Sequence, residues 1–522
     1  MNRAASTADM DVQTLRALVN EQVQIIAERE RQIAKHERTI NEREARIALL
    51  TDHIAQLRRA RFGSRSEKMD PDQRALFDET MDADIAAVEA ELEALQSSDQ
   101  SGDDTNAKQR PRRAPKRRPL PEDLERVETR HEPESCACGQ CGNGLVHIGD
   151  HVSEKLSCKP LEFFVRRDVY PQYACRACET ITAVPVAPAV IDRGIAAPDL
   201  LAQVLVSKYI DHLPLYRQEA IFARSGIAIP RSTLAQWVGA CGVALQPLVD
   251  RMRKVLLEQP VLHADETPVG MLKPGHGKTH RSYLFVYRNA TGPPITVFDF
   301  CTSRSGKHAR HFLGPWQGTL MVDDYAGYKQ SFKAGVTELA CWAHARRKFV
   351  DQHKASDSPI ARAAIERIAV LYRIEAETKD MTVEDRHAHR QRHAVPALHQ
   401  IKSWLDELRP KVAGNSGTAR AMDYTLRRWP ALARYAEHGS YPIDNNPVEN
   451  AIRPVALGRK NWLFAGSESA GKRAAAIMSL LATAKAAGHE PQAWLTDVLT
   501  RLPTTLDRDI DSLLPYGWKP PV

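Results

Sequence analysis

The sequence predicts a multidomain protein of mixed α and α/β class, and three features of the 522-residue chain support that prediction. A heptad pattern fills an N-terminal stretch, two Cys-x-x-Cys pairs follow it, and short β-type runs then alternate with helical patterns. At about 100–200 residues per domain, this length corresponds to three or four folding units. The hydrophobic fraction of 43% and the charged fraction of 26% exclude a collagen-like or wholly disordered chain.

An apolar residue recurs at every seventh position near the N-terminus, and the stretch contains neither Pro nor Gly. This strict period predicts a left-handed coiled coil, and β-branched residues at the repeated position favour two parallel strands. The second core series is polar in its middle, so the coil should be weakest there. We expect a homodimer or a higher oligomer; the alternative is a single amphipathic helix packed on its own protein. The seven residues of this seam are Val12, Val19, Ile26, Ile33, Ile40, Ile47 and Ile54.

The net charge of +7 conceals a strong separation of charge along the chain. Between Asp70 and Asp104 there are twelve acidic residues and one basic residue, whereas seven of the eleven residues from Lys108 to Arg118 are basic. Because prolines interrupt this basic run, it predicts an extended arm that lies along DNA phosphates. The alternative is a solvated linker neutralised by the acidic stretch. The candidate DNA-contacting residues of the arm are Arg112, Arg113, Lys116, Arg117 and Arg118.

No apolar run approaches the 20 or so residues that cross a bilayer, and no signal peptide pattern opens the chain. We therefore expect a cytoplasmic protein without a membrane partner. Nine cysteines in 522 residues are too few for a disulfide scaffold, and their clustering indicates metal binding in a reducing compartment.

Two cysteine pairs have the spacing of zinc knuckles, and the residues between them alternate apolar and polar from Phe163 to Tyr173, as in a strand. This pattern predicts a zinc ribbon with one structural Zn²⁺. Four thiolates leave no open coordination position, which argues against a catalytic zinc. Cys136 is a possible substitute ligand. The four predicted ligands are Cys138, Cys141, Cys175 and Cys178.

Helical patterns fill residues 198–249, with a break at Ser225-Gly226 and a possible N-cap at Ser232. A helix, a glycine turn and a second helix are compatible with a helix-turn-helix DNA reader. A helical connector domain would give the same pattern, so both interpretations stay open.

Carboxylates end two of the β-type runs that follow, at Asp265 and Asp323, and Glu449 lies in a predicted helix after Asn445-Asn446-Pro447. Like charges brought together in this way need a divalent cation. Basic and aromatic residues alternate after Glu449, a pattern that suits contact with a DNA strand end. The basic residues are Arg453, Arg459 and Lys460.

Several longer motifs together resemble one family. They are HADETPV at 263–269, LMVDDYAGYK at 320–329, CWAHARRKF at 341–349, NNPVENAIRPVALGRKNWLFAGS at 445–467 and LLPYGW at 513–518. The chain resembles, over nearly its whole length, the transposases of the Insertion Sequence 66 (IS 66) family, whose catalytic core is an RNase H-like DDE domain.

The resemblance implies that Asp265, Asp323 and Glu449 form a metal-binding catalytic triad. The family usually has Gly after its second Asp, where this chain has Asp324, a less favoured substitute for Asp323. Cys341 and His344 match a Cys-x-x-His signature that orients related cores, with a purely structural pair as the alternative. Three carboxylates of this kind would hold two Mg²⁺ (or Mn²⁺) ions about 3.5–4 Å apart.

The implied function is a bacterial DNA transposase that cleaves the ends of its insertion sequence and joins the 3′-OH ends to target DNA. The resemblance implies that its partners are the terminal inverted repeats, the target DNA and small accessory proteins of the kind often found beside family members. It would associate with the nucleoid when bound to DNA. The alternatives are a DNA-binding regulator without catalysis and a metal-dependent nuclease without strand transfer.

The carboxylates divide the predicted core, because 126 positions (449 − 323) separate the second from the third and helical patterns occupy 360–372, 395–408 and 418–435. The predicted order is a coiled-coil helix (10–62), an acidic then basic linker (63–125), a zinc ribbon (126–190), a helix-turn-helix-like domain (191–258), the first part of the core (259–350), a helical insertion (351–440), the second part of the core with the Glu helix (441–488) and a C-terminal tail (489–522).

Overall fold

The computed structural model describes residues 12–62, 71–97, 120, 122, 124–132, 143–159, 162–273 and 278–520. The chain divides into two compact units, one formed by residues 1–63 and 88–112 and the other by residues 64–87 and 113–522. In the part of the chain described, no helix combines the length and apolar character needed to cross a membrane. The predicted basic arm, with Arg112, Arg113, Lys116, Arg117 and Arg118, lies outside the described residues.

The first unit contains a single helix of 51 residues, α1 (Val12–Phe62), and the C-terminal part of α2 (Pro71–Ser97). The helix predicted from the heptad pattern is therefore confirmed. Two ion pairs join α1 to α2, Arg46 with Glu91 at 2.5 Å and Arg58 with Glu89 at 2.6 Å.

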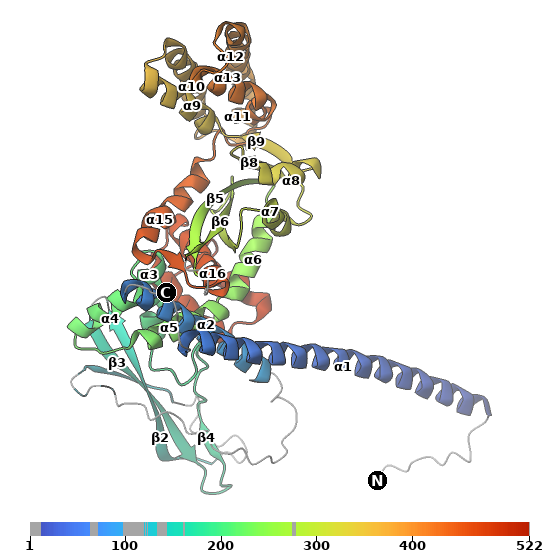
Figure 1. Cartoon of the computed structure of the whole chain (residues 1–522). Helices are drawn as coiled ribbons and strands as arrows, with labels where there is room; N and C mark the ends of the chain where they lie inside the picture. The colour runs from blue at the N-terminus through green and yellow to red at the C-terminus, as the bar shows by residue number, and fades with distance from the viewer. Residues whose placement is uncertain are drawn as a thin grey trace. The chain divides into compact units, whose positions relative to one another are not determined.

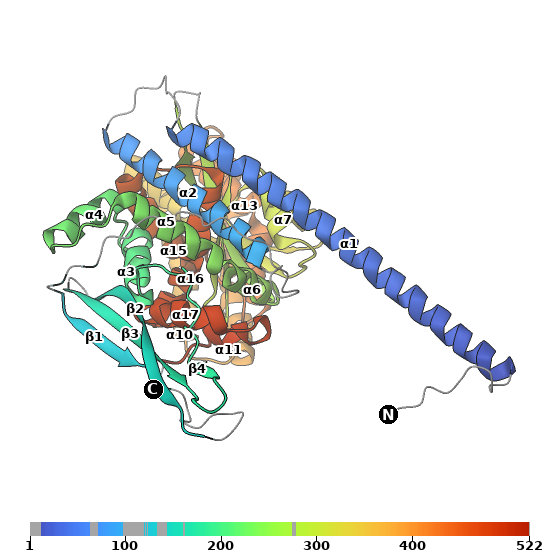
Figure 2. The same cartoon turned by 90° about the horizontal axis from the view of Figure 1, so that it is seen from below.

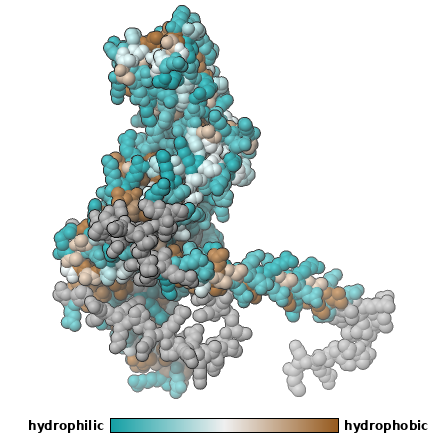
Figure 3. Space-filling model, in the orientation of Figure 1, coloured by the Kyte–Doolittle hydropathy of each residue, from teal (hydrophilic) through white to brown (hydrophobic). Residues whose placement is uncertain are grey.

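The apolar seam of α1 is buried at its C-terminal end and exposed further toward the N-terminus. Ile54 is 8% exposed, whereas Ile26, Ile33 and Ile40 are 53%, 56% and 53% exposed. Hydrophobic residues accordingly interrupt the polar surface along this helix (Figure 3). Of the five seam residues whose burial is described, a single copy of the chain thus leaves three largely exposed to water.

The second unit begins with a four-stranded sheet formed by β1 (Arg126–Arg130), β2 (Val146–Lys159), β3 (Glu162–Ala174) and β4 (Ile181–Ala183). β2 and β3 form a long antiparallel hairpin, β1 pairs parallel with β3, and β4 pairs antiparallel with β3. The strand predicted over 163–173 is confirmed. Cys175 and Cys178 follow β3 directly, but Cys136, Cys138 and Cys141 lie outside the described residues.

Four helices follow this sheet, α3 (Pro198–Tyr209), α4 (Leu215–Arg224), α5 (Arg231–Ala244) and α6 (Gln246–Leu257). The predicted break is confirmed, because Ser225 ends α4 and Gly226 has a φ of 82°. The predicted N-cap at Ser232 is wrong. The N-cap is Pro230, two residues earlier, and α5 begins at Arg231. The Glu219 carboxylate of α4 accepts a hydrogen bond from the Arg231 backbone N–H at 3.0 Å and so satisfies one of the free donors of the first turn.

A six-stranded sheet forms the centre of the second unit. Its strands are β5 (Val261–Met271), β6 (His280–Asn289), β7 (Thr296–Cys301), β8 (Thr319–Val322), β9 (Thr337–Ala340) and the short β10 (Phe464–Ala465). The order is β7-β6-β5-β8-β9, with β5, β6 and β7 antiparallel and β5, β8 and β9 parallel; β10 pairs parallel with the far end of β5. The predicted Gly292-Pro293 turn joins β6 to β7, and Gly292 has a φ of 78°.

Helices from the C-terminal part of the chain cover this sheet: α15 (Asn446–Trp462) packs on β5 and β6, and α16 (Glu468–Ala486) packs on β7 (Figure 1). The Ser479 and Thr483 hydroxyls of α16 accept hydrogen bonds from the β7 backbone at Phe298 (2.8 Å) and Thr296 (3.1 Å). These bonds satisfy donors that an edge strand would otherwise expose. α17 (Pro491–Arg501) packs on α3, as Figure 2 shows.

A helical insertion separates β9 from α15 and has an apolar core of its own. The helices predicted over 360–372 and 395–408 are confirmed. The one predicted over 418–435 is interrupted at Arg428, after which a new helix begins at Trp429 with Pro430 in its first turn. Shorter helices, α7 (Gly306–Leu313) and α8 (Lys329–Lys333), connect strands of the sheet. The insertion consists of α9 (Trp342–Ser356), α10 (Pro359–Glu377), α11 (Val383–His389), α12 (Val395–Leu408), α13 (Gly417–Arg427) and α14 (Trp429–Ala433).

Candidate active site

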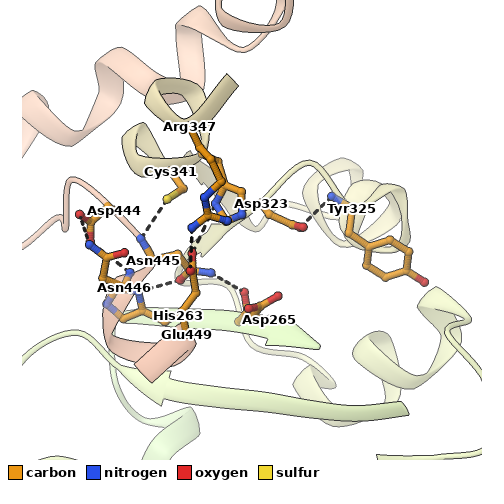
Figure 4. Close-up of polar contacts among 12 residues, drawn as sticks. His263, Asp265, Asp323, Tyr325, Cys341, Arg347, Asp444, Asn445, Asn446 and Glu449 are labelled. Carbon is orange, nitrogen blue, oxygen red and sulfur yellow. Dashed lines mark hydrogen bonds and ion pairs between the residues drawn. The ribbon is translucent and has the colours of Figure 1, made fainter. Parts of the chain in front are cut away.

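The three predicted catalytic carboxylates come from neighbouring parts of the second unit. Asp265 lies on β5, Asp323 directly follows β8, and Glu449 lies in the first turn of α15 (Figure 4). Because His263 pairs with Met321 in the parallel register of β5 and β8, Asp265 and Asp323 occupy equivalent levels on the two strands. The helix that carries Glu449 packs on β5.

The sequence suggested that Asp265 ends its strand, but in the structure Asp265 lies inside the strand. β5 continues to Met271 because its antiparallel pairing with β6 extends that far, whereas its parallel pairing with β8 stops at His263. Asp265 therefore lies just beyond the last pairing of β5 with β8. The end of β8 leaves space beside β5 at this position. This position, rather than a strand end, brings it near Asp323.

The electrostatics of Asp265 indicate a cluster of negative charge. The pKa of its carboxyl is raised from 3.8 to about 7, mainly by burial. The charges of Asp323, Glu266 and Glu449 contribute to this rise, and the hydrogen bond donated by the Glu266 backbone N–H at 2.8 Å opposes it. The Tyr325 backbone N–H donates to Asp323 at 2.9 Å. Carboxylates are the donor type that a divalent cation neutralises. The ligand atoms of Asp265, Asp323 and Glu449 are nevertheless not among the described groups of three that all lie within 4.8 Å of one another.

Two basic side chains from α9 face Glu449. Arg347 Nη2 lies 3.2 Å from one carboxylate oxygen, and His344 Nδ1 lies 3.5 Å from the other. Burial lowers the pKa of His344, although Glu449 opposes that shift. The Cys341 Sγ, a His344 ring nitrogen and a Glu449 oxygen all lie within 4.8 Å of one another. The predicted supporting pair, Cys341 and His344, thus lies beside the third carboxylate.

Sequence reasoning missed a further carboxylate, Glu266, which lies next to the three predicted ones. Glu266 has a side chain that is 1% exposed, and Arg304 binds it with Nη2 at 2.5 Å and Nε at 2.8 Å. Burial raises the pKa of Glu266. The Arg304 guanidinium also lies 4.2 Å from the Tyr325 ring centre. The HADE motif contained Glu266, but no pattern in the sequence pointed to Arg304.

Asp324 has a separate role in the structure. It pairs with Arg427 at 3.0 Å and Arg428 at 3.3 Å, both from the end of α13 in the insertion. Arg428 is 8% exposed, and its Nη2 also donates to the backbone carbonyl of Asp323 at 2.9 Å. Asp324 therefore links the core to the insertion, which leaves Asp323 as the candidate ligand.

The basic residues predicted after Glu449 differ in their surroundings. Arg453 and Lys460 are exposed, whereas Arg459 is partly buried and donates from Nη1 to the Pro268 carbonyl of β5 at 2.7 Å. Arg459 thus has a structural contact that the sequence did not reveal.

Comparisons with known proteins agree with this architecture. Residues 193–473 match the family described as "Transposase IS66 family", and residues 479–516 match "IS66 C-terminal element". Residues 134–179 match "zinc-finger binding domain of transposase IS66", and residues 49–129 match "Transposase C of IS166 homeodomain". The chain belongs to the IS66 transposase family, and this membership supports a transposase role that depends on a divalent metal.

Curated relatives match over most of their length. The chain is 36% identical over 502 residues to the uncharacterized protein y4qI of Sinorhizobium fredii (strain NBRC 101917 / NGR234), which covers 93% of this chain and 91% of that protein. It is 38% identical over 417 residues to the uncharacterized protein y4jD of the same organism, which covers 77% of this chain and 81% of that protein.

Proposed function

We propose that the protein cleaves the ends of its insertion sequence and joins the resulting 3′-OH ends to target DNA. The observation that carries this proposal is the placement of Asp265, Asp323 and Glu449 on neighbouring elements, where burial and then the charges of the other carboxylates raise the pKa of Asp265. The sheet supports it as well. Three antiparallel strands followed by two parallel ones, with the Glu helix packed on β5, support the proposal of an RNase H-like core.

In this proposal Asp265, Asp323 and Glu449 hold two Mg²⁺ or Mn²⁺ ions. These ions would activate the attacking water or 3′-OH and stabilise the leaving oxygen of an in-line displacement at phosphorus. Arg347 pairs with Glu449 and is about half exposed, so it can turn to a phosphate that enters the site. Arg304 is held beside the cluster by Glu266 and offers a second cation to the DNA backbone.

The remaining regions would bind DNA and assemble the protein. We propose that Arg453 and Lys460, together with the basic arm, contact DNA phosphates and that Cys138, Cys141, Cys175 and Cys178 hold a structural Zn²⁺. The exposed seam of α1 supports self-association as a dimer or higher oligomer. The protein would associate with the nucleoid when it is bound to DNA, with or without small accessory proteins. Its domains would have the boundaries predicted from the sequence.

The decisive experiment compares cleavage of an element-end duplex in Mg²⁺ by the wild type and by Asp265→Ala, Asp323→Ala and Glu449→Ala. We expect each of the three variants to lose cleavage. Asp324→Ala is the matched control, because it removes a neighbouring carboxylate that pairs with Arg427 and Arg428, and it should still cleave. Full cleavage by Glu449→Ala would contradict the triad.

A second assay separates strand transfer from simple hydrolysis. A duplex that already carries the 3′-OH end is incubated with target DNA, Mg²⁺ and the purified protein, with and without accessory proteins. Joined products support the transposase mechanism, and cleavage without any joined product would favour the nuclease alternative. DNA binding without cleavage in either assay would favour the regulator.

A further inference from the structure

We propose that Asn445 is a positioning residue that fixes the Glu449 carboxylate relative to Asp265 by linking the start of α15 to β5. This inference rests on the proposed function, since it assigns Glu449 and Asp265 to one metal site. Asn445 is fully buried and lies between the two elements that carry these carboxylates.

The side chain of Asn445 does not do what its position in the helix predicts. Asn445 is the N-cap residue of α15, and an Asn there normally accepts a hydrogen bond from the second or third N–H of its own helix. Its side chain makes no such bond. The neighbouring Asp444 instead accepts from the Asn446 backbone N–H at 3.1 Å. The sequence thus identified the start of the helix but not the use of this side chain.

Both polar atoms of the Asn445 side chain point to β5 (Figure 4). Its Nδ2 donates to the Ala264 carbonyl at 2.9 Å, and its Oδ1 lies 2.9 Å from His263 Nδ1. Because Oδ1 can only accept, His263 must carry a proton on Nδ1 and donate it. The two contacted residues immediately precede Asp265 on the strand.

The backbone of Asn445 extends the same link. Its N–H donates to the Sγ of Cys341, the N-cap residue of α9, at 3.2 Å, and its carbonyl accepts from the Glu449 N–H at 3.2 Å. One buried residue therefore contacts the strand of Asp265, the start of α9 and the backbone of Glu449. A shift of Asn445 along β5 would change the separation of the two carboxylates.

The arrangement favours a positioning role over a purely structural one. A buried Asn without partners is costly, so its bonds to β5 hold the helix at one register. Residues that orient metal ligands in this way typically change metal affinity about 10–100-fold when they are replaced.

The test measures Mn²⁺ binding to the full-length protein by electron paramagnetic resonance, which requires no DNA and no catalysis. Asn445→Ser is the informative variant, because Ser is a good N-cap but is too short to reach β5. We expect its melting temperature to fall, because His263 and Ala264 lose a buried partner, but the protein to stay folded at the assay temperature while its Mn²⁺ affinity falls about tenfold or more. Asn446→Ala, at the exposed neighbouring position, is the matched control and should bind Mn²⁺ like the wild type.

A second variant keeps the proposal testable if Asn445→Ser unfolds. His263→Leu removes the donor to Oδ1 from the strand side and should also weaken Mn²⁺ binding, and the double variant should lose less than the product of the two single effects because both break one link. Wild-type affinity in both Asn445→Ser and His263→Leu would overturn the inference. Failure of the wild type to bind Mn²⁺, or unchanged binding by Asp265→Ala, would instead contradict the proposed metal site.

Discussion

The carboxylate site and the N-terminal helix differ in whether their side chains find partners within one chain. Around the site, buried polar groups find partners within the second unit, as when Arg428 bonds to the Asp323 backbone and Asn445 bonds to β5. Along α1, Ile33 and its neighbours on the seam are more than half exposed although their spacing is regular. The buried polar groups named at the carboxylate site have their hydrogen-bond partners within one chain. The seam of α1 leaves apolar surface in water, which a second copy of the same seam would cover.

The largest effect should come from breaking that seam. The double variant Ile33→Asp/Ile40→Asp places charges at two successive core positions of the coil, and each buried Ile contributes about 1.5–3 kcal/mol to association. We expect the assembly to dissociate to single chains of 58.4 kDa, measured by sedimentation equilibrium.

The matched control for the seam is Ala27→Asp/Ala34→Asp, which adds the same charge at positions that directly follow the seam residues Ile26 and Ile33 and lie off the seam. It should stay associated. If the control dissociates as well, added charge rather than loss of the seam is responsible. If neither variant dissociates, α1 does not assemble the protein.

The second-largest effect should appear at the carboxylate site, in the pH dependence of the free energy of unfolding. The pKa of Asp265 is raised from 3.8 to about 7, so the folded protein holds this proton more tightly than the unfolded chain. Stability from this group is therefore greatest at low pH, falls as the pH rises from about 4 to 7, and is constant above that range. A rise of this size corresponds to at most about 4 kcal/mol.

Asp265→Asn cannot ionise and should escape that loss. In EDTA, its melting temperature should increasingly exceed that of the wild type between pH 5 and pH 7, and the difference should then level off up to pH 8. The measurement is thermal unfolding followed by circular dichroism. A difference that does not change between pH 5 and pH 8 would show that the Asp265 carboxyl is not in a buried, acidic cluster.

The smallest effects should distinguish two adjacent arginines that both pair with Asp324. Arg428→Ala leaves the Asp323 carbonyl and the Glu338 carboxylate without a buried donor, which should cost about 1–3 kcal/mol of unfolding free energy. Arg427 is 65% exposed, so Arg427→Ala should cost less than about 1 kcal/mol. Urea unfolding of both variants checks this difference, and equal losses would mean that burial does not set the value of these pairs.

Local patterns predicted the elements well because periodicity is a property of neighbouring residues. The heptad spacing predicted α1, and the β-type run at 319–322 matches β8. The identities of Asp265, Asp323 and Glu449 as candidates came from longer motifs, and their roles stay a prediction.

The partners of these residues could not be predicted, because they depend on which distant segments meet. The residues adjacent in sequence predict that the Asn445 side chain caps a helix. It instead donates a hydrogen bond to a strand residue 181 positions earlier. Arg304 and Arg428 stand in unremarkable sequence, and only the packing of the loop after β7 and of the insertion brings them to the carboxylates. The extent of β5 likewise depends on its pairing with β6.

The division of the core by the insertion also orders events during synthesis. Asp265 and Asp323 leave the ribosome first, and Glu449 is added 126 positions (449 − 323) after Asp323, which at about 5–20 residues per second takes about 6–25 seconds. The β7 edge stays uncovered still longer, until Ser479 and Thr483 of α16 have been made. A chain that is still being made, or that ends before Glu449, thus lacks the third carboxylate, so under the proposed function it would not cut DNA.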